Sequence, residues 1–323
     1  MTENKKFDVT SIGSTMIRLS VPSGERLESA NSYSVHTAGT EANTLTALSR
    51  MGRKTAWVSR LKRDSLGQRV ENDIHMFGVD TSRIIWTESD RNEVFYVEYG
   101  ASPRGIKVIY DRLGSALSKI HWGEIDRDYL LDTRFLHMTG ILPALSDNCR
   151  IVTQQAMAAA KDAGVKVSFD VNYRSNLWPP EEAGNALRPL IGLCDILFLT
   201  REDAKDLFNL SGDPYHVLQS AMELFQPEIC VITLGGEGAV ASDGDRRYSS
   251  SAYPVEIIDR LGAGDSFTAG FLSGYLEGSI EMGLQYGLAM AALKLGIKGD
   301  YFISNREEVL RLIDTSGSRE IGR

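Results

Sequence analysis

The sequence predicts an α/β protein with a doubly wound, mainly parallel sheet, helices that flank the sheet, and a small β-sheet lid. Apolar strand-like runs alternate with amphipathic helix-like runs along most of the chain, which is typical of a parallel sheet covered on both faces. Two stretches, 14–37 and 92–112, are rich in β-forming residues without a helical run between their strands, and they predict the lid. Right-handed crossovers would join these parts into one domain over residues 1–323.

The main sheet is predicted from six apolar runs. In chain order they are FDVTSIG (7–13), KTAWVSRL (54–61), RFLHMTG (134–140), VKVSFDVN (165–172), CDILFLT (194–200) and EICVITLG (228–235). Amphipathic runs predict helices over residues 41–51, 66–78, 148–164 and 202–208. Within the lid, NEVFYVEYG and GIKVIYDRL are predicted to form a hairpin through the turn ASPRG, although an extension of the main sheet's edge is the alternative.

From Asp265 onward the chain is predicted to be mainly helical. An apolar stripe repeats every four residues through Phe267, Phe271 and Tyr275. A second face of the same helix carries only small side chains, which would let the helix approach the sheet closely; these are Ala269, Gly270, Ser273 and Gly274.

The composition is that of a globular protein without a nucleic-acid or membrane partner. Of the 323 residues, 42% are hydrophobic and 24% are charged, the net charge is −8, and no block of Lys and Arg stands out. The polar start MTENKK and the lack of a long apolar run lead us to expect a cytoplasmic protein without a signal peptide. Cys149, Cys194 and Cys230 are far apart in apolar surroundings, and we expect buried free thiols.

The run DRLGAGDSFTAGF (259–271) carries the chemistry. Gly262, Ala263 and Gly264 precede a predicted helix, whose N–H groups and dipole favour a bound anion. Asp265 follows at the helix start, where the dipole should keep its carboxylate ionised. A carboxylate there could accept the proton of an attacking hydroxyl, because phosphoryl transfer depends mainly on positioning and charge neutralisation. The alternative is an ordinary helix-capping Asp after a glycine turn.

Other nucleotide-binding signatures are missing from the sequence. There is no GxxxxGK[ST] loop and no HRD or DFG motif. The run TLGGEGA (233–239) lacks the GxGxxG form and follows a late strand, whereas a dinucleotide-binding fold carries its fingerprint after the first strand.

Four separated motifs, in order, resemble those of the ribokinase-like (PfkB) carbohydrate kinases. They are AGTEAN (38–43), FDVNYR (169–174), TLGGEG (233–238) and DRLGAGD (259–265), and the resemblance runs from about residue 7 to 314. It implies a ribokinase-like fold and ATP-dependent phosphorylation of a sugar hydroxyl, with Mg²⁺ accompanying the nucleotide. It also implies that Asp265 is the catalytic base and that Gly262, Ala263 and Gly264 form the anion hole.

The resemblance also implies residues that bind the two substrates. For the nucleotide they are Asn172, Arg174, Thr200, Thr233, Leu234, Gly235, Gly236, Glu237 and Gly238, together with the three residues of the anion hole. For the sugar they are Gly39, Asn43, Phe95, Tyr110, Arg112, Arg174, Asp265 and Asp300. Asp203 stands at the acidic position of the family's Asn-x-x-Glu motif, here Thr-Arg-Glu-Asp (200–203), and is expected to bind the metal through water.

The pattern YDRLGSALS (110–118) with NYRSNLW (172–178) looks like the 2-keto-3-deoxygluconate kinase branch of this family. Arginine binds carboxylates with two parallel hydrogen bonds, so Arg18, Arg112 and Arg174 facing one cleft would suit a sugar acid. The alternatives are surface arginines, and for Asp300 a turn-forming Asp. A kinase for another sugar or sugar acid, such as fructose, and a non-catalytic sensor also stay open.

Several positions depart from the family pattern. Ala38 replaces the first glycine of the usual pair, and Phe95 stands where a substrate-facing Tyr is common. Arg260 and Leu261 replace the residues usual before the glycine turn, so whether the monovalent-cation site of some relatives survives here stays open. The exposed apolar strands of the lid, such as VFYVEY, lead us to expect a homo-oligomer formed through the lid.

Overall fold

The computed structural model describes residues 5–100 and 103–320, and it confirms the predicted fold class. An eight-stranded sheet forms the centre of the body, in the order β14-β13-β12-β11-β10-β9-β1-β4. The six predicted runs supply its parallel strands, which are β1 (Phe7–Ile12), β4 (Thr55–Val58), β9 (Thr133–Thr139), β10 (Lys166–Asp170), β11 (Ile196–Thr200) and β12 (Ile229–Thr233). Two antiparallel strands extend one edge, β13 (Ala239–Ser242) and β14 (Arg247–Ser250).

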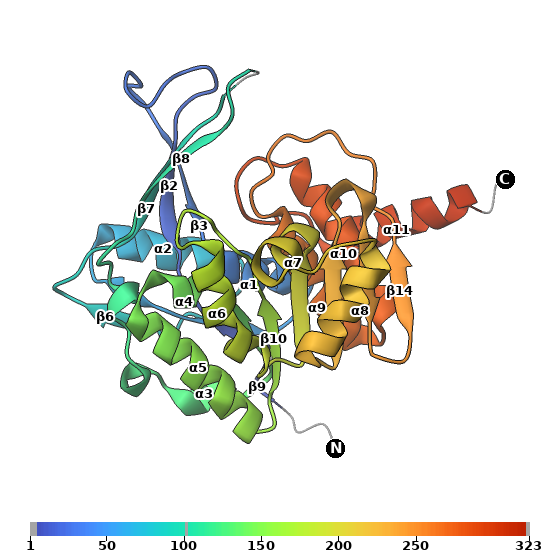
Figure 1. Ribbon diagram of the computed structural model, residues 1–323. Coiled ribbons are helices and arrows are strands. Elements are labelled where there is room, and N and C mark those ends of the chain that lie inside the picture. Colours follow the sequence, from blue (N-terminus) through green and yellow to red (C-terminus); the bar gives the residue numbers. More distant parts are fainter. Residues whose placement is uncertain (1–4, 101–102, 321–323) are drawn as a thin grey trace.

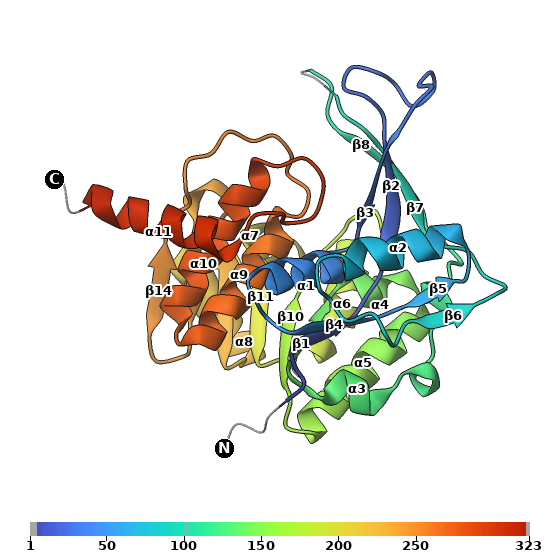
Figure 2. The same cartoon turned by 180° about the vertical axis from the view of Figure 1, so that it is seen from behind.

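Helices cover both faces of this sheet and enclose two apolar cores. One face carries α3 (Arg127–Leu131), α4 (Ile141–Leu145), α5 (Asp147–Asp162), α6 (Pro180–Ile191), α7 (Arg201–Phe208) and α8 (Pro214–Phe225) (Figure 1). The other face, seen in Figure 2, carries α1 (Thr40–Arg50), α2 (Ser65–His75), α9 (Ala263–Glu277), α10 (Ile280–Leu295) and α11 (Arg306–Glu320). A pair of short strands, β5 (Arg60–Lys62) and β6 (Ile85–Thr87), lies beside them.

The lid is a separate four-stranded sheet that projects from the body (Figure 1). Its order is β3-β2-β7-β8, with bounds β2 (Met16–Ser20), β3 (Ser34–Ala38), β7 (Val94–Glu98) and β8 (Lys107–Asp111). β7 and β8 pair antiparallel as the predicted hairpin, and residues 101–102 of its predicted turn ASPRG (101–105) lie outside the described residues. Val35 and Ile109 are 43% and 44% exposed on the lid, and the expected oligomer stays a prediction.

The two glycines on the small-residue face of α9 lie against α10, so the predicted contact of this face with the sheet is wrong. A Cβ atom added at Gly270 would lie 2.5 Å from the carbonyl oxygen of Tyr286, and one at Gly274 would lie 2.4 Å from that of Met282. The aromatic stripe faces the sheet instead, because the ring of Phe271 meets that of Phe198 on β11 edge to face, with centroids 5.2 Å apart.

The cysteines agree with the expectation from the sequence. Cys149, Cys194 and Cys230 are buried and free, and burial raises the pKa of the Cys149 and Cys194 thiols to about 12. Among the described residues, no helix combines the length and the apolar character needed to cross a membrane.

Candidate active site

A cleft of about 650 Å³ opens at the carboxyl ends of the parallel strands, next to the base of the lid. Open α/β sheets place ligand sites at this edge. The body contributes the ends of β10, β11 and β12 and the start of α9, while the lid contributes Met16, Phe95, Tyr110 and Arg112. The cleft therefore brings together segments more than 200 residues apart in the sequence.

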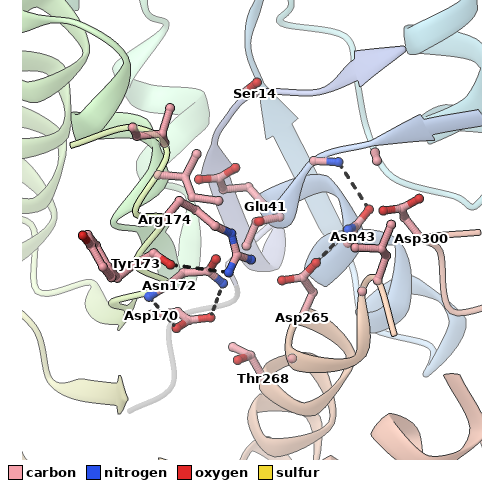
Figure 3. Close-up of a pocket in the computed structure, with 18 of the residues that line it drawn as sticks. Ser14, Glu41, Asn43, Asp170, Asn172, Tyr173, Arg174, Asp265, Thr268 and Asp300 are labelled. Carbon is pink, nitrogen blue, oxygen red and sulfur yellow. Dashed lines mark hydrogen bonds between the residues drawn. The ribbon is translucent and has the colours of Figure 1, made fainter. Parts of the chain in front are cut away.

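Asp265 lies in the first turn of α9 and lines the cleft, facing Asn43 on α1 (Figure 3). The Nδ2 atom of Asn43 donates a 2.7 Å hydrogen bond to Oδ2 of Asp265. Burial raises the pKa of Asp265 to about 6, although the Asn43 hydrogen bond and the charge of Arg174 lower it. Burial dominates this shift of the Asp265 pKa, and no pattern in the sequence indicated it. Asp265 is ionised at neutral pH and is a stronger base than an exposed Asp.

The glycine turn before Asp265 is shaped by close packing on one side and open space on the other. Gly262 has φ +81°, and a Cβ atom there would lie 2.0 Å from the carbonyl oxygen of Asp300. At Gly264 an added Cβ atom would meet nothing within 4 Å. Both glycines line the cleft, whereas Ala263 does not and directs its N–H to the Arg260 carbonyl at 3.4 Å. The first N–H groups of a helix have no partner within it, so this turn suits an anion.

A group of oxygen atoms lies across the cleft at the ends of β10 and β11 (Figure 3). Asp170 and Asp203 line this part, and burial raises their pKa values to about 7 and about 6. Asn172, with φ +42°, donates from Nδ2 to Oδ2 of Asp170 at 2.9 Å, while its buried Oδ1 has no hydrogen-bond partner. These are ligands that Mg²⁺ prefers, and Mg²⁺ is commonly held by one or two carboxylates together with phosphate oxygens and water. The donor set therefore fits the implied metal.

No three or more His, Cys, Asp and Glu residues among those the structure describes form a metal-holding group on their own. Thr200 caps α7, because its Oγ accepts a hydrogen bond from the Asp203 N–H at 2.9 Å. Asp203, the expected metal ligand, thus lies in the first turn of α7 and lines the cleft.

Of the expected nucleotide loop, Thr233 lines the cleft and pairs in register with Thr200 on the neighbouring strand. The next five residues form a turn between β12 and β13 outside the cleft lining: Leu234, Gly235, Gly236, Glu237 and Gly238. Gly235 and Gly238 have positive φ values of +59° and +118°, which only glycine adopts readily in such a turn. The turn lies at the same sheet edge as the glycine turn of α9.

The lid side of the cleft carries an arginine with unused hydrogen-bonding capacity. Arg112 is 8% exposed, its Nη2 donates to Oγ of Ser14 at 3.2 Å, and its Nε has no hydrogen-bond partner. Oε2 of Glu93 lies 3.7 Å from the same Nη2. Tyr110 stacks on Phe95 with centroids 5.6 Å apart, and both rings line the cleft.

The other expected sugar contacts also reach the cleft. Gly39 precedes α1, and a Cβ atom there would lie 1.9 Å from the carbonyl oxygen of Ser14, so only glycine fits. Arg174 is exposed and points toward Asp265 (Figure 3). Asp300 lines the cleft, but its carboxylate accepts a hydrogen bond from Arg18.

Arg18 does not face the cleft, so its expected role in binding a substrate carboxylate is wrong. It is 1% exposed, and its guanidinium forms ion pairs with Asp259, at 3.2 Å, and with Asp300. Both carboxylates come from the far end of the chain, so no local sequence pattern around Arg18 predicts these ion pairs.

Two buried acids of the cleft were missed by the sequence analysis. Glu41 on α1 accepts a 2.5 Å hydrogen bond from Thr139, its second oxygen has no partner, and burial raises its pKa to about 7. Its place within AGTEAN was the available signal, but an acid in a first helical turn is usually explained by the dipole. Asp170 lies within the FDVNYR motif and was likewise passed over.

The family model described as pfkB family carbohydrate kinase matches residues 6–307. The chain belongs to this family. The prediction of an ATP-dependent carbohydrate kinase is thereby confirmed. The PfkB kinase is 36% identical over 307 residues to a 2-dehydro-3-deoxygalactonokinase of Haloferax volcanii, covering 95% of this chain and 96% of the relative.

Solved structures agree with this membership. A 2-dehydro-3-deoxygluconokinase of Thermotoga maritima superposes with a TM-score of 0.90 at 30% identity, covering 95% of this chain and 98% of that one. An Escherichia coli structure named Ribokinase II, in complex with ATP and Mg²⁺, shares the fold with a TM-score of 0.87 at 22% identity, covering 96% and 99% of the two chains.

Proposed function

We propose that this PfkB kinase transfers the γ-phosphoryl group of ATP to the terminal hydroxyl of 2-keto-3-deoxygluconate, with Asp265 as the base. The observation that carries the proposal is the pairing, in one cleft, of a buried Asp265 with a buried Arg112 whose Nε–H has no partner. A buried donor without an acceptor is costly, and a substrate carboxylate would satisfy it. Relatives named for 2-dehydro-3-deoxy sugar acids support this substrate class.

Asp265 is suited to accept the proton of the sugar hydroxyl. Its pKa of about 6 keeps it ionised at neutral pH, yet above the value of an exposed Asp. As the hydroxyl oxygen forms its bond to the γ-phosphorus, the bond to the oxygen between the β- and γ-phosphates breaks, and the hydroxyl proton passes to the Asp265 carboxylate. The loose transition state of phosphoryl transfer requires an aligned acceptor more than a strong base. The Asn43 hydrogen bond fixes that alignment.

The glycine turn would hold the migrating phosphoryl group. Gly264 leaves open space above the first N–H groups of α9, which lies at the positive end of the helix dipole. Arg174, exposed within the cleft, adds a positive charge beside Asp265. These groups neutralise the charge on the phosphoryl oxygens without moving during the reaction.

Asp170, Asp203 and Oδ1 of Asn172 would hold Mg²⁺, in part through water. When bound, this ion neutralises the charge of the phosphate oxygens. The raised pKa values of Asp170 and Asp203 reflect carboxylates removed from water that gain from a nearby cation.

The sugar would lie between the lid and α9. Arg112 would bind its carboxylate, and the stacked rings of Tyr110 and Phe95 would cover its carbon chain. Glu93 reduces the net positive charge around Arg112, so we expect the carboxylate to be recognised mainly by the hydrogen-bonding edge at Nε. Closure of the lid over the sugar would exclude water from the phosphoryl group.

A panel of acceptors tests this proposal. Purified enzyme with ATP and Mg²⁺ is offered 2-keto-3-deoxygluconate, its C4 epimer 2-keto-3-deoxygalactonate, gluconate, fructose and ribose, and ADP release is followed. We expect kcat/KM for the 2-keto-3-deoxy acids to exceed that for fructose by at least about 100-fold, because a neutral sugar leaves the Arg112 Nε–H unsatisfied. A preference for a neutral sugar would contradict the acid substrate, and turnover of none of them would refute the kinase assignment.

The galactonate epimer is the second candidate substrate, and the 36% identical relative named for it is the observation that favours it. The two acids share the carboxylate and the keto group, so Arg112 would serve either. The ratio of the two kcat/KM values in the same panel decides between them. If kcat/KM for 2-keto-3-deoxygluconate exceeds that for 2-keto-3-deoxygalactonate, the first proposal is supported. If it is the smaller of the two values, the second candidate replaces the first.

A further inference from the structure

Four charged side chains from three distant parts of the chain are buried together behind the glycine turn. Arg18 comes from β2 of the lid, Asp259 precedes the turn, Lys294 lies in the last turn of α10, and Asp300 follows that helix. Their exposed fractions are 1%, 3%, 0% and 6%. Of these four side chains only Asp300 also lines the cleft. The cluster therefore lies mainly behind the cleft surface and supports it from within.

The carboxylate of Asp259 is saturated by donors from the protein. Oδ2 accepts hydrogen bonds from Nη2 of Arg18 at 3.2 Å, from the Tyr99 hydroxyl at 3.1 Å and from the Gly299 N–H at 3.1 Å. Oδ1 accepts one from the Leu261 N–H at 3.2 Å. A dehydrated cation needs several free oxygen ligands, whereas this carboxylate already accepts four hydrogen bonds from the protein.

Each of the three nitrogen atoms of the Arg18 guanidinium also has a partner. Its Nε donates to Oγ of Ser20 at 2.9 Å, and its Nη1 donates to the Asp300 carboxylate. The guanidinium therefore bridges the two acids and joins the lid strand β2 to both segments that shape the glycine turn.

Lys294 is the second basic residue of the cluster. Its ammonium donates to the carbonyl oxygen of Ile297 at 3.0 Å, just beyond the end of α10. The N–H groups of Ile258 and Asp259 donate to the carbonyl of Leu295, so the end of this helix lies directly against the segment that leads into the turn. Burial lowers the pKa of Lys294, and the charges of Asp259 and Asp300 oppose that effect. A carbonyl oxygen that could bind a small cation is thus already occupied.

This cluster forms the floor of the glycine turn. Asp259 holds the N–H of Leu261, and the α-carbon of Gly262 lies against the main-chain carbonyl of Asp300. Any displacement of these two acids would move the anion hole. Because two uncompensated carboxylates could not stay buried at this place, the cations beside them decide whether the turn keeps its shape.

We infer that Arg18 and Lys294 are built-in counter-charges that hold Asp259 and Asp300, and through them the glycine turn, in place of the monovalent cation used by some relatives. Arg18 and Lys294 are positioning residues, since neither touches the cleft. The inference rests on the proposed kinase activity for one of its readouts, and thermal unfolding provides a readout that does not depend on that activity.

The test compares salts of equal ionic strength. Wild-type enzyme is measured in potassium chloride and in tetramethylammonium chloride, whose cation is too large for a buried site. We expect equal kcat/KM values and equal melting temperatures in the two salts. A several-fold activation by potassium, or a melting temperature that rises in potassium only, would overturn the inference.

Substitution of Lys294 should make activity and melting temperature depend on potassium. We expect Lys294→Ala to lose at least about tenfold in kcat in tetramethylammonium and to recover activity and melting temperature in potassium. The vacated space borders the Ile297 carbonyl, and the negative charges of Asp259 and Asp300 act on this place. Full activity of this variant in tetramethylammonium would overturn the inference.

Two further variants complete the experiment. Lys298→Ala, an exposed lysine in the same segment, is the matched control and should behave as wild type in both salts. Should the alanine variant not fold, Lys294→Gln, which keeps most of the side-chain length without the charge, is measured in the same way. If wild type phosphorylates no sugar, the kinase proposal fails, and the melting temperatures of wild type and variant in the two salts still decide this inference.

Discussion

The side chain of Asn43 donates a 2.7 Å hydrogen bond to Oδ2 of Asp265, and this bond joins the start of α1 to the start of α9. Burial raises the pKa of Asp265, and the Asn43 bond opposes that effect by stabilising the charged form. The two residues are separated by 222 positions, yet Asn43 orients the Asp265 carboxylate and lowers its pKa.

Asn43→Ala should therefore move the acid limb of the pH–rate profile upward. Loss of one hydrogen bond to a buried carboxylate raises the pKa of Asp265, and we expect the midpoint of kcat/KM against pH to rise by about one pH unit. The profile is measured with saturating Mg-ATP across the range from weakly acidic to weakly basic pH. Thr46→Val, on the same helix, removes a hydroxyl that bonds to the Asn43 carbonyl and should leave the midpoint in place. An unchanged midpoint in Asn43→Ala would argue against Asp265 as the titrating group.

Two glycines of the α9 turn should respond differently to alanine. Gly262→Ala forces a Cβ atom to 2.0 Å from a carbonyl oxygen at positive φ, so we expect it to destabilise the fold by about 2 kcal/mol or more. Gly264→Ala meets no atom within 4 Å and adds a better helix former, so the free energy of unfolding should change by less than about 1 kcal/mol.

Both variants should nevertheless lose activity. The clash in Gly262→Ala would displace the turn, and the methyl group of Gly264→Ala would occupy the space assigned to the phosphoryl group. Urea denaturation and kcat/KM for ATP separate the two effects. A fully active Gly264→Ala enzyme would show that no phosphate oxygen approaches this turn.

Arg112→Gln tests the substrate carboxylate contact. The change removes the positive charge and the unpartnered Nε–H, so KM for sugar acids should rise by at least about tenfold while KM for a neutral acceptor changes little. Arg104→Gln, an exposed lid arginine paired with Glu98, is the matched control and should leave both KM values unchanged. Equal losses for acid and neutral acceptors in Arg112→Gln would indicate a structural role only.

The unliganded enzyme should be more stable at weakly acidic pH than at pH 8. Burial raises the pKa values of Glu41 and Asp170 to about 7 and those of Asp203 and Asp265 to about 6. The folded state then binds more protons than the unfolded state between pH of about 4 and 7, and stability falls as the pH rises through that window, by on the order of 1.4 kcal/mol for each pKa unit of difference.

Urea unfolding at several pH values measures this slope. Glu41→Gln keeps a partner for the Thr139 hydroxyl but removes one titrating group, so its stability should depend less steeply on pH. Asp245→Asn, an exposed acid in a surface turn, should keep the wild-type slope. A wild-type stability that rises steadily from weakly acidic pH to pH 8 would contradict the pKa shifts.

The sequence predicted the parallel strands well, because each is a short apolar run buried on both faces. It missed α6 and α8, although each begins with a proline at the first helical position, Pro180 and Pro214, which is a recognisable start signal. The antiparallel pair β13 and β14 was missed because the glycine turn before it was interpreted only as a nucleotide loop.

The site was predictable where a local motif carried it and not where tertiary burial decided it. Asp265 and its glycines follow from one run of sequence. Arg18 was assigned to the substrate because arginine binds carboxylates, whereas its actual partners lie 241 and 282 positions away and form no local pattern. The raised pKa values of Glu41 and Asp170 depend on complete removal from water, which no spacing of residues reports.

Turnover of the Asp265→Asn variant tests the central claim most directly. The amide keeps the size of the side chain but cannot accept the hydroxyl proton, so kcat for the preferred sugar acid should fall at least about 100-fold while calorimetry shows ATP binding within a few-fold of wild type. A variant that retains wild-type kcat would contradict the assignment of Asp265 as the base.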